Sequence, residues 1–156
     1  MKNTQTLRNK LSALKKISTP LDEKTYWNCI DSVIKHPAKR FDMTNELIKE
    51  VEKLSLEEIK GFHLRTQQLV NNIRSSSLHN IAIRLNDGSC SDDGFDYFIN
   101  WLISQGKEVY YSAKEKPEFL INKYGIGGMY SFEEFSYLAD YAFESKTGKD
   151  LFSYLD

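Results

Sequence analysis

Cysteine and proline are scarce in this sequence, with two and three residues among 156. Cys29 and Cys90 cannot form the kind of disulfide framework that stabilises small secreted domains, and their spacing matches no zinc motif. No apolar run approaches the roughly 18 residues of a membrane-spanning helix. Residues 1–16 also lack the continuous apolar segment of a signal peptide. These absences favour a cytoplasmic protein without a membrane span.

An excess of charge of either sign is missing as well. The chain has 21 Lys and Arg residues against 22 Asp and Glu residues, for a net charge of −1, which argues against nucleic-acid binding through bulk electrostatics. No internal repeat marks a domain boundary. A 40% apolar content with two Trp, nine Tyr and nine Phe suffices for a hydrophobic core. We therefore expect one folded domain.

Residues 1–20 differ in composition from the remainder, since all their charged side chains are basic. Leu7, Leu11 and Leu14 follow helical spacing, which predicts a basic amphipathic helix. Such a helix can dock on its own domain, lie on a membrane surface or contact a nucleic acid. We accordingly divide the chain into an N-terminal extension, residues 1–20, and a helical domain, residues 21–156.

Capping signals and helical periodicity organise the rest of the chain. Asp22 is an expected N-cap, and two capping boxes begin at Ser55 and Ser131, each with a glutamate three residues later. Residues 125–128 form a glycine turn, and Gly148 is an expected left-handed helix end. We predict an all-α, orthogonally packed bundle of six to eight helices. Beyond the extension, helices are expected at about 22–35, 43–54, 55–74, 78–85, 92–106, 107–114 and 131–147.

Four carboxylates, those of Asp87, Asp92, Asp93 and Asp96, lie close together in the sequence without a basic neighbour. They can cap and favour the start of a helix, present an acidic surface to a basic partner, or bind Mg²⁺ or Ca²⁺. The N-cap of that helix is Ser91 or Asp92. Because capping is the expected task of Asp92, we assign the other three to a partner-binding surface. We assign no cofactor and no metal site.

Cys90 is the one candidate nucleophile, because a thiol that precedes a helix N-terminus is expected to have a lowered pKa. A base would have to come from His36, His63 or His79. None of them lies at a spacing typical of a catalytic pair, and cysteine is commonly a small buried residue. We assign no catalytic residue.

The segment around Cys90-Ser-Asp-Asp93, residues 88–106, resembles the signature of a bacterial family known as domain of unknown function 4240. Tyr26-Trp27, residues 54–62 and residues 144–148 are similar to flanking features of that family. The resemblance covers about residues 21–151. It implies an all-helical fold and brings no established activity.

The first functional hypothesis is a non-enzymatic protein-binding module of a bacterial cytosol, such as a toxin-neutralising, immunity-like protein or an adaptor. Its partner would be another protein, for example a basic toxin domain. One alternative is a metal-assisted enzyme that uses Asp87, Asp92, Asp93 and Asp96. Another is a nucleic-acid-associated module that uses the basic N-terminal helix. Convergence of the four carboxylates on one point would favour the enzyme.

Overall fold

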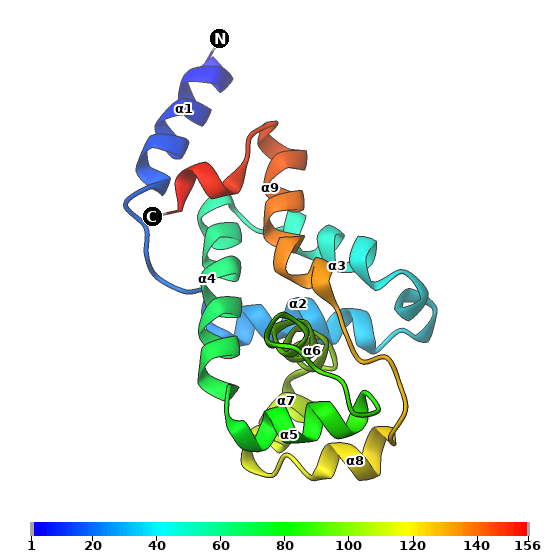
Figure 1. Ribbon diagram of the computed structural model, residues 1–156. Helices are drawn as coiled ribbons and strands as arrows, with labels where there is room; N and C mark the ends of the chain where they lie inside the picture. Colours follow the sequence, from blue (N-terminus) through cyan, green and yellow to red (C-terminus); the bar gives the residue numbers. More distant parts are fainter. Residues whose placement is uncertain (1, 156) are drawn as a thin grey trace. The chain divides into compact units, whose positions relative to one another are not determined.

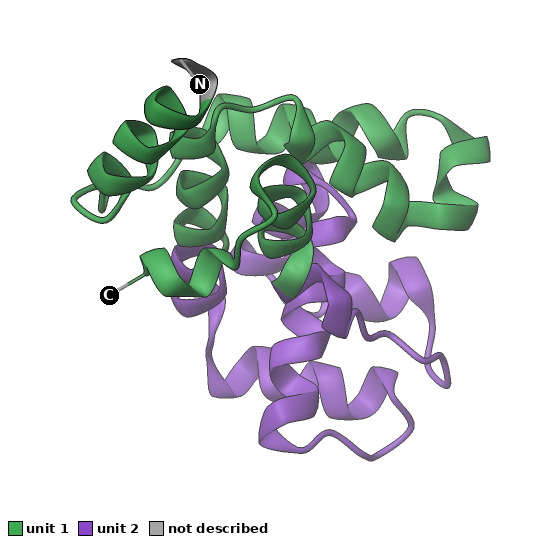
Figure 2. Ribbon diagram, turned by 90° about the horizontal axis from the view of Figure 1, so that it is seen from above, with its two compact units in different colours: residues 1–66, 137–156 green, residues 67–136 purple. Residues whose placement is uncertain are grey.

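The computed structural model of the protein describes residues 2–155, and every regular element in this range is helical. The predicted all-α class is therefore confirmed. Nine α-helices and three 3₁₀ segments occur in the described residues, one α-helix more than the largest expected number. The chain divides into two compact units (Figure 2): residues 1–66 with 137–156, and residues 67–136.

The first unit contains both ends of the chain (Figures 1 and 2). Helix α3 packs against α2 and α9, and Trp27 and Phe62 are buried with the ring of Tyr26 between them, 5.3 Å and 4.5 Å from their centroids. The elements of this unit are α1 (Lys2–Leu14), α2 (Glu23–Ile34), η1 (Pro37–Asp42), α3 (Met43–Glu52), the first part of α4 (Leu56–Ile73), α9 (Leu138–Thr147) and η3 (Leu151–Tyr154).

The second unit begins within α4 and ends within a 3₁₀ segment. Helix α6 packs against α5 and α7, and the short α8, which the sequence did not predict, packs against α5 and α7. Phe95 and Phe98 are buried as their helical spacing implies, whereas Trp101 is half-buried. Its further elements are α5 (Ser76–Leu85), α6 (Asp92–Ser104), α7 (Lys107–Glu115), α8 (Phe119–Tyr124) and η2 (Glu133–Tyr137).

The basic N-terminal helix α1 docks on its own unit. Leu11 and Leu14 are 5% and 1% exposed. Removal of this apolar stripe from water favours the docked position of the helix. Lys60 of α4 is also buried, at 2% exposure, and its Nζ donates a hydrogen bond of 2.8 Å to the Leu14 carbonyl oxygen. The same carbonyl accepts from the Ile17 N–H at 3.1 Å, so the ammonium adds a second donor at the end of α1, where no intrahelical donor exists. Of the three roles open to α1, the structure supports docking.

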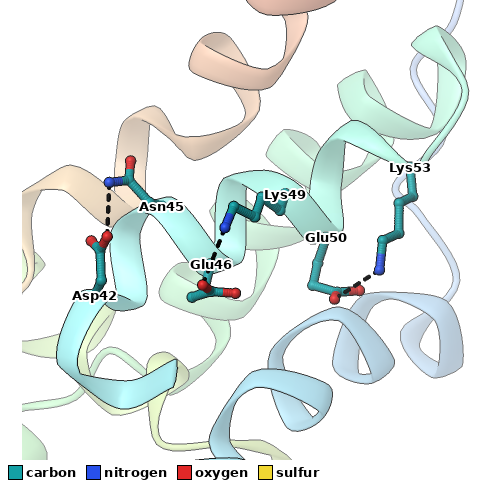
Figure 3. A network of polar contacts seen from close by, with 6 residues as sticks. All are labelled: Asp42, Asn45, Glu46, Lys49, Glu50 and Lys53. Carbon is teal, nitrogen blue, oxygen red and sulfur yellow. Dashed lines mark hydrogen bonds and ion pairs between the residues drawn. The ribbon is translucent and has the colours of Figure 1, made fainter. Parts of the chain in front are cut away.

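The outer face of α3 has a row of local polar pairs (Figure 3). Lys49 and Lys53 each contact the glutamate three residues earlier, at 3.3 Å and 3.0 Å. Asp42 makes no capping bond to the backbone of α3, and its carboxylate instead accepts from the Asn45 side chain at 2.9 Å. Exposed pairs at this spacing contribute about 0.2–0.5 kcal/mol each. The stability of α3 therefore rests mainly on buried Leu47 and Val51.

The first capping box forms as predicted. The backbone N–H of Glu58 donates to Ser55 Oγ, and the backbone N–H of Ser55 donates to Glu58 Oε1, both at 3.1 Å. Asp22 likewise caps α2 by accepting from the Thr25 N–H at 2.9 Å. At the other end of the chain, Gly148 closes α9 with a left-handed φ of +70°.

The prediction of a second capping box at Ser131 is wrong. Ser131 makes no capping bond to Glu134 in the described chain, and the residues that follow form η2 before α9 begins at Leu138. The N–H of Phe132 donates instead to the Tyr97 carbonyl of α6 at 3.0 Å, and Ser136 Oγ accepts from Asn100 at 2.7 Å. These two bonds to α6 hold residues 132–136 in a course that differs from a regular α-helix.

We predict that Ser55→Ala destabilises the protein by about 1 kcal/mol, because it removes a reciprocal N-cap from an exposed position. For a chain of this length, that is a fall of about 2–4 °C in the thermal midpoint. Ser131→Ala is the matched control and should change the midpoint by less than about 1 °C. Equal losses in the two variants, measured by thermal denaturation, would contradict the helix starts described above.

Candidate interaction surface beside helix α6

The connection between α5 and α6 begins with a tight helix end. The N–H groups of Gly88 and Asp87 donate to the Ile83 and Arg84 carbonyls at 2.7 Å and 3.3 Å, a pattern that closes a helix with one left-handed residue. Asp87 is that residue, with φ of +60°, where glycine is the usual choice. Its carboxylate also lies beside the negative end of the α5 dipole. Asp87 therefore occupies a position that disfavours it on two grounds.

The start of α6 is capped by Ser91, whose Oγ accepts from the Gly94 N–H at 3.1 Å. Asp92 consequently has no capping role. The sequence prediction leaves it out of the partner-binding surface because it is expected to cap α6, and that reason is wrong. Asp92 and Asp93 are both exposed in the first turn, where the positive end of the helix dipole favours an acid.

Asp96 has a basic partner that is distant in the sequence, which the lack of a basic neighbour within residues 86–97 could not reveal. Its carboxylate forms an ion pair with the guanidinium of Arg74, which lies just after α4. Arg74 also lies 5.5 Å from the centroid of Phe95, and the His79 ring stacks on the same phenyl ring at 4.4 Å. Between residues 2 and 155, no ion pair forms with Asp87, Asp92 or Asp93. The unbalanced acidic charge thus belongs to these three exposed residues.

The connection between α5 and α6, together with the first turn of α6, spans residues 86–94, and we call it the acidic connection. A glycine-rich loop lies beside it. The Gly127 N–H donates to the Leu85 carbonyl at 2.9 Å, and the Tyr130 N–H donates to Asn86 Oδ1 at 2.8 Å. The Tyr130 hydroxyl oxygen also lies 2.7 Å and 2.9 Å from the Tyr124 and Gly125 carbonyl oxygens, which can accept its single proton. The turn predicted at residues 125–128 is present, and it is anchored to the end of α5.

Anchoring of this loop leaves two apolar side chains in solvent. Met129 is 96% exposed and Ile126 is 57% exposed. Sequence reasoning missed them because it followed apolar residues only at helical spacing. The available signal was an Ile and a Met within a run of glycines, where no helix face can bury them.

The acidic connection and the glycine loop form the walls of a shallow groove with a volume of about 340 Å³. We call it the α6 groove. In the sequence, Asp87 lies between the lining residues Asn86 and Ser89, and Asp92 and Asp93 lie between Ser91 and Gly94. The groove is lined by Asn86, Ser89, Cys90, Ser91, Gly94, Gly128, Met129, Tyr130 and Ser131.

Cys90 lines the groove without the features of a nucleophile. Burial, and secondly the charge of Asp92, raise the pKa of its thiol, which contradicts the lowering expected from the helix dipole. His79 Nε2 lies 3.0 Å from the Cys90 carbonyl oxygen, so this histidine contacts the backbone. Burial alone lowers the pKa of His63, whose ring contacts Phe152 edge-on at 5.9 Å.

The four aspartates do not converge on a point. Within residues 2–155, no three His, Cys, Asp or Glu side chains are grouped so that they could hold a metal ion. The three exposed acids extend along the connection, and Asp96 turns to Arg74. This arrangement presents charge over a surface, which suits contact with a partner.

Residues 21–145 match the family described as Protein of unknown function (DUF4240). The chain belongs to this family. No curated protein and no solved structure matches it significantly. The match includes the α6 groove and begins after α1, so the N-terminal helix lies outside it. None of the helices in the described range is both long and apolar enough to cross a membrane.

We predict that Asp87→Asn and Asp93→Asn change stability in opposite directions. Asn also tolerates the left-handed conformation, and it removes an anion from the C-terminal end of α5, so Asp87→Asn should stabilise the protein by about 0.5 kcal/mol. Asp93→Asn removes a favourable anion from the start of α6 and should destabilise it by a similar amount. Chemical denaturation of both variants at low ionic strength measures the difference. Changes of the same sign would contradict the helix boundaries at this surface.

Proposed function

We propose that this protein is a non-enzymatic protein-binding module that contacts its partner through the α6 groove. The observation that carries the proposal is the fixed exposure of Met129 beside unbalanced acidic charge. A partner segment with basic and apolar side chains would complement both features. The partner-binding set predicted from the sequence, Asp87, Asp93 and Asp96, is retained with Asp92 added, and Asp96 is expected to contribute least.

Electrostatics supports a basic partner. Asp87, Asp92 and Asp93 are exposed and form no ion pair among residues 2–155, so no ion pair with a basic side chain in that range offsets their mutual repulsion. A basic surface would be attracted to such a patch and would associate faster. The unfavourable position of Asp87 supports the same interpretation, since strained residues are retained most readily where they serve a function.

The apolar side chains support a contact that excludes water. Methionine is flexible and polarizable, and it adapts to the shape of a partner. Met129 is held out by a loop whose backbone is anchored to Leu85 and Asn86, so little loop ordering opposes binding. An exposed methionine beside charged residues resembles the composition of interface cores surrounded by polar rims.

Toxin neutralisation and an adaptor role in a bacterial cytoplasm both belong to this proposal, with a basic toxin domain as one kind of partner. The metal-assisted alternative receives no support from the spread of the four aspartates. The nucleic-acid alternative receives none from α1, whose apolar stripe packs on its own unit. Neither alternative is supported by a specific observation in the structure.

The test is capture of proteins from a lysate of the native host with wild type and two variants of equal charge change. Asp87→Lys/Asp93→Lys reverses the acidic surface. Glu115→Lys/Glu118→Lys reverses two exposed acids that do not line the groove. We expect a partner that wild type and the control recover equally and that Asp87→Lys/Asp93→Lys loses.

Association and dissociation rates measured with the purified partner then distinguish the contribution of the acidic charges from that of the apolar contact. Asp87→Lys/Asp93→Lys should slow association about tenfold at low salt, whereas Met129→Ala should mainly speed dissociation. Equal recovery of every protein by all three baits would refute the binding surface. Turnover of a substrate by the isolated protein would favour an enzyme instead.

A further inference from the structure

A larger concave region lies in the first unit, where α1 meets the start of α4. Its volume is about 520 Å³, within the range of roughly 300–1,000 Å³ that is typical of small-molecule sites. Residues of α1, the first residues of α4 and Lys146 of α9 line it. We call it the α1 pocket.

The apolar side chains that line the α1 pocket make up what we call its floor. Leu7, Ile17 and Leu56 line it and are half-buried, so part of each side chain still faces the pocket in the structure. Leu14 also lines the pocket and is 1% exposed. When a ligand covers apolar surface in a concave site, removal of that surface from water favours binding.

The charged side chains that line the pocket, which we call its rim, have an excess of positive charge. Lys10 and Lys146 contribute two ammonium groups, and Glu57 contributes the one carboxylate. Lys146 is held by a hydrogen bond from Nζ to the Leu54 carbonyl oxygen. Lys10 is exposed, and no ion pair within residues 2–155 involves it. The capping box occupies the start of α4, so the lysines are the groups that would meet an anion.

Most of the residues that line the pocket lie outside the range matched by the family. Helix α1 precedes residue 21 and Lys146 follows residue 145, whereas only the wall from residues 55–57 lies within the matched range. The N-terminal helix thus adds a concave, positively rimmed surface to the family domain. Docking through Leu11, Leu14 and the Lys60 bond holds that helix in place.

We infer that the α1 pocket binds a small amphipathic monoanion, an apolar chain with one carboxylate. The chain would lie on the leucine and isoleucine floor, and the carboxylate would meet Lys10 and Lys146 at the rim. One net positive charge at the rim matches one negative charge on the ligand. The site is separate from the α6 groove, so it stands whether or not the protein-binding proposal holds.

Binding of decanoate below its critical micelle concentration, followed by isothermal titration calorimetry on the full chain, tests the inference. Decyltrimethylammonium has the same apolar chain and the opposite charge. Lys10→Glu should weaken decanoate binding about tenfold, since it reverses a charge at the rim. Lys15→Glu, an equal change just after α1 and outside the pocket lining, should alter the affinity less than twofold.

A second pair of variants tests the apolar floor without removing a core residue. Ala13 is exposed and lines the pocket, so Ala13→Trp should fill it and weaken decanoate binding at least tenfold. Ser12→Trp places the same side chain at the neighbouring exposed position outside the lining and should leave binding unchanged. Thermal midpoints of all four variants are measured alongside, and they should remain within a few degrees of wild type.

Three outcomes would overturn the inference. One is equal affinity of decanoate and decyltrimethylammonium, which would show that the rim does not select an anion. Another is equal weakening by Lys10→Glu and Lys15→Glu. The third is binding to anionic lipid vesicles, or to a second copy of the chain in light scattering, without binding of monomeric decanoate.

Discussion

Helix ends impose the constraint on which most of this structure depends. The last carbonyl groups of a helix have no partner within the helix, and buried ones must be satisfied from elsewhere. Local N–H groups satisfy several of these carbonyls, and three further donors come from distant parts of each unit. Lys60 donates to the carbonyl of Leu14, Lys146 to that of Leu54, and the Gly127 N–H to that of Leu85. The first and third bonds each join a helix end to another element, and the second joins α9 to the loop between α3 and α4, so helix termination and tertiary packing are coupled.

The same constraint shapes both concave regions. In the first unit, the Lys60 bond holds the end of α1 against α4, and the α1 pocket lies beside that junction. In the second unit, the end of α5 receives the glycine loop, and the α6 groove lies between them. Hydrogen bonds made to complete helix ends therefore also hold surface side chains in defined positions. Such ordering lowers the entropic cost of a later contact.

At the α6 groove, the electrostatic role of each acidic residue depends on its place relative to helix ends and basic side chains more than on its residue type. Asp87 and Asp93 have the same side chain, yet one lies at the negative end of α5 and the other at the positive end of α6. Asp96, one turn further on, is balanced by Arg74. Cys90 precedes a helix start, but burial and the Asp92 charge outweigh the dipole and raise the pKa of its thiol. Neighbours within a few ångströms decide each case.

Much of the helical content could be predicted because the relevant signals are local. Asp22 and Ser55 accept from N–H groups three residues ahead, and the stripes of α2 and α6 follow from a 3.6-residue period. The same local reasoning failed at Ser131. There, bonds from residues 132 and 136 to α6 override the capping box, and tertiary contacts commonly override such weak local preferences.

The sequence by itself determined the all-helical class, the family and most helix starts, since these depend on residues within about one turn of each other. Only the tertiary structure decided which acids remain unbalanced, since Arg74 is 22 positions from Asp96. It also decided that α1 docks through Lys60, which lies 46 positions from Leu14. Charge balance and burial depend on neighbours in space, and in a chain of helices those neighbours come from elements far apart in the sequence.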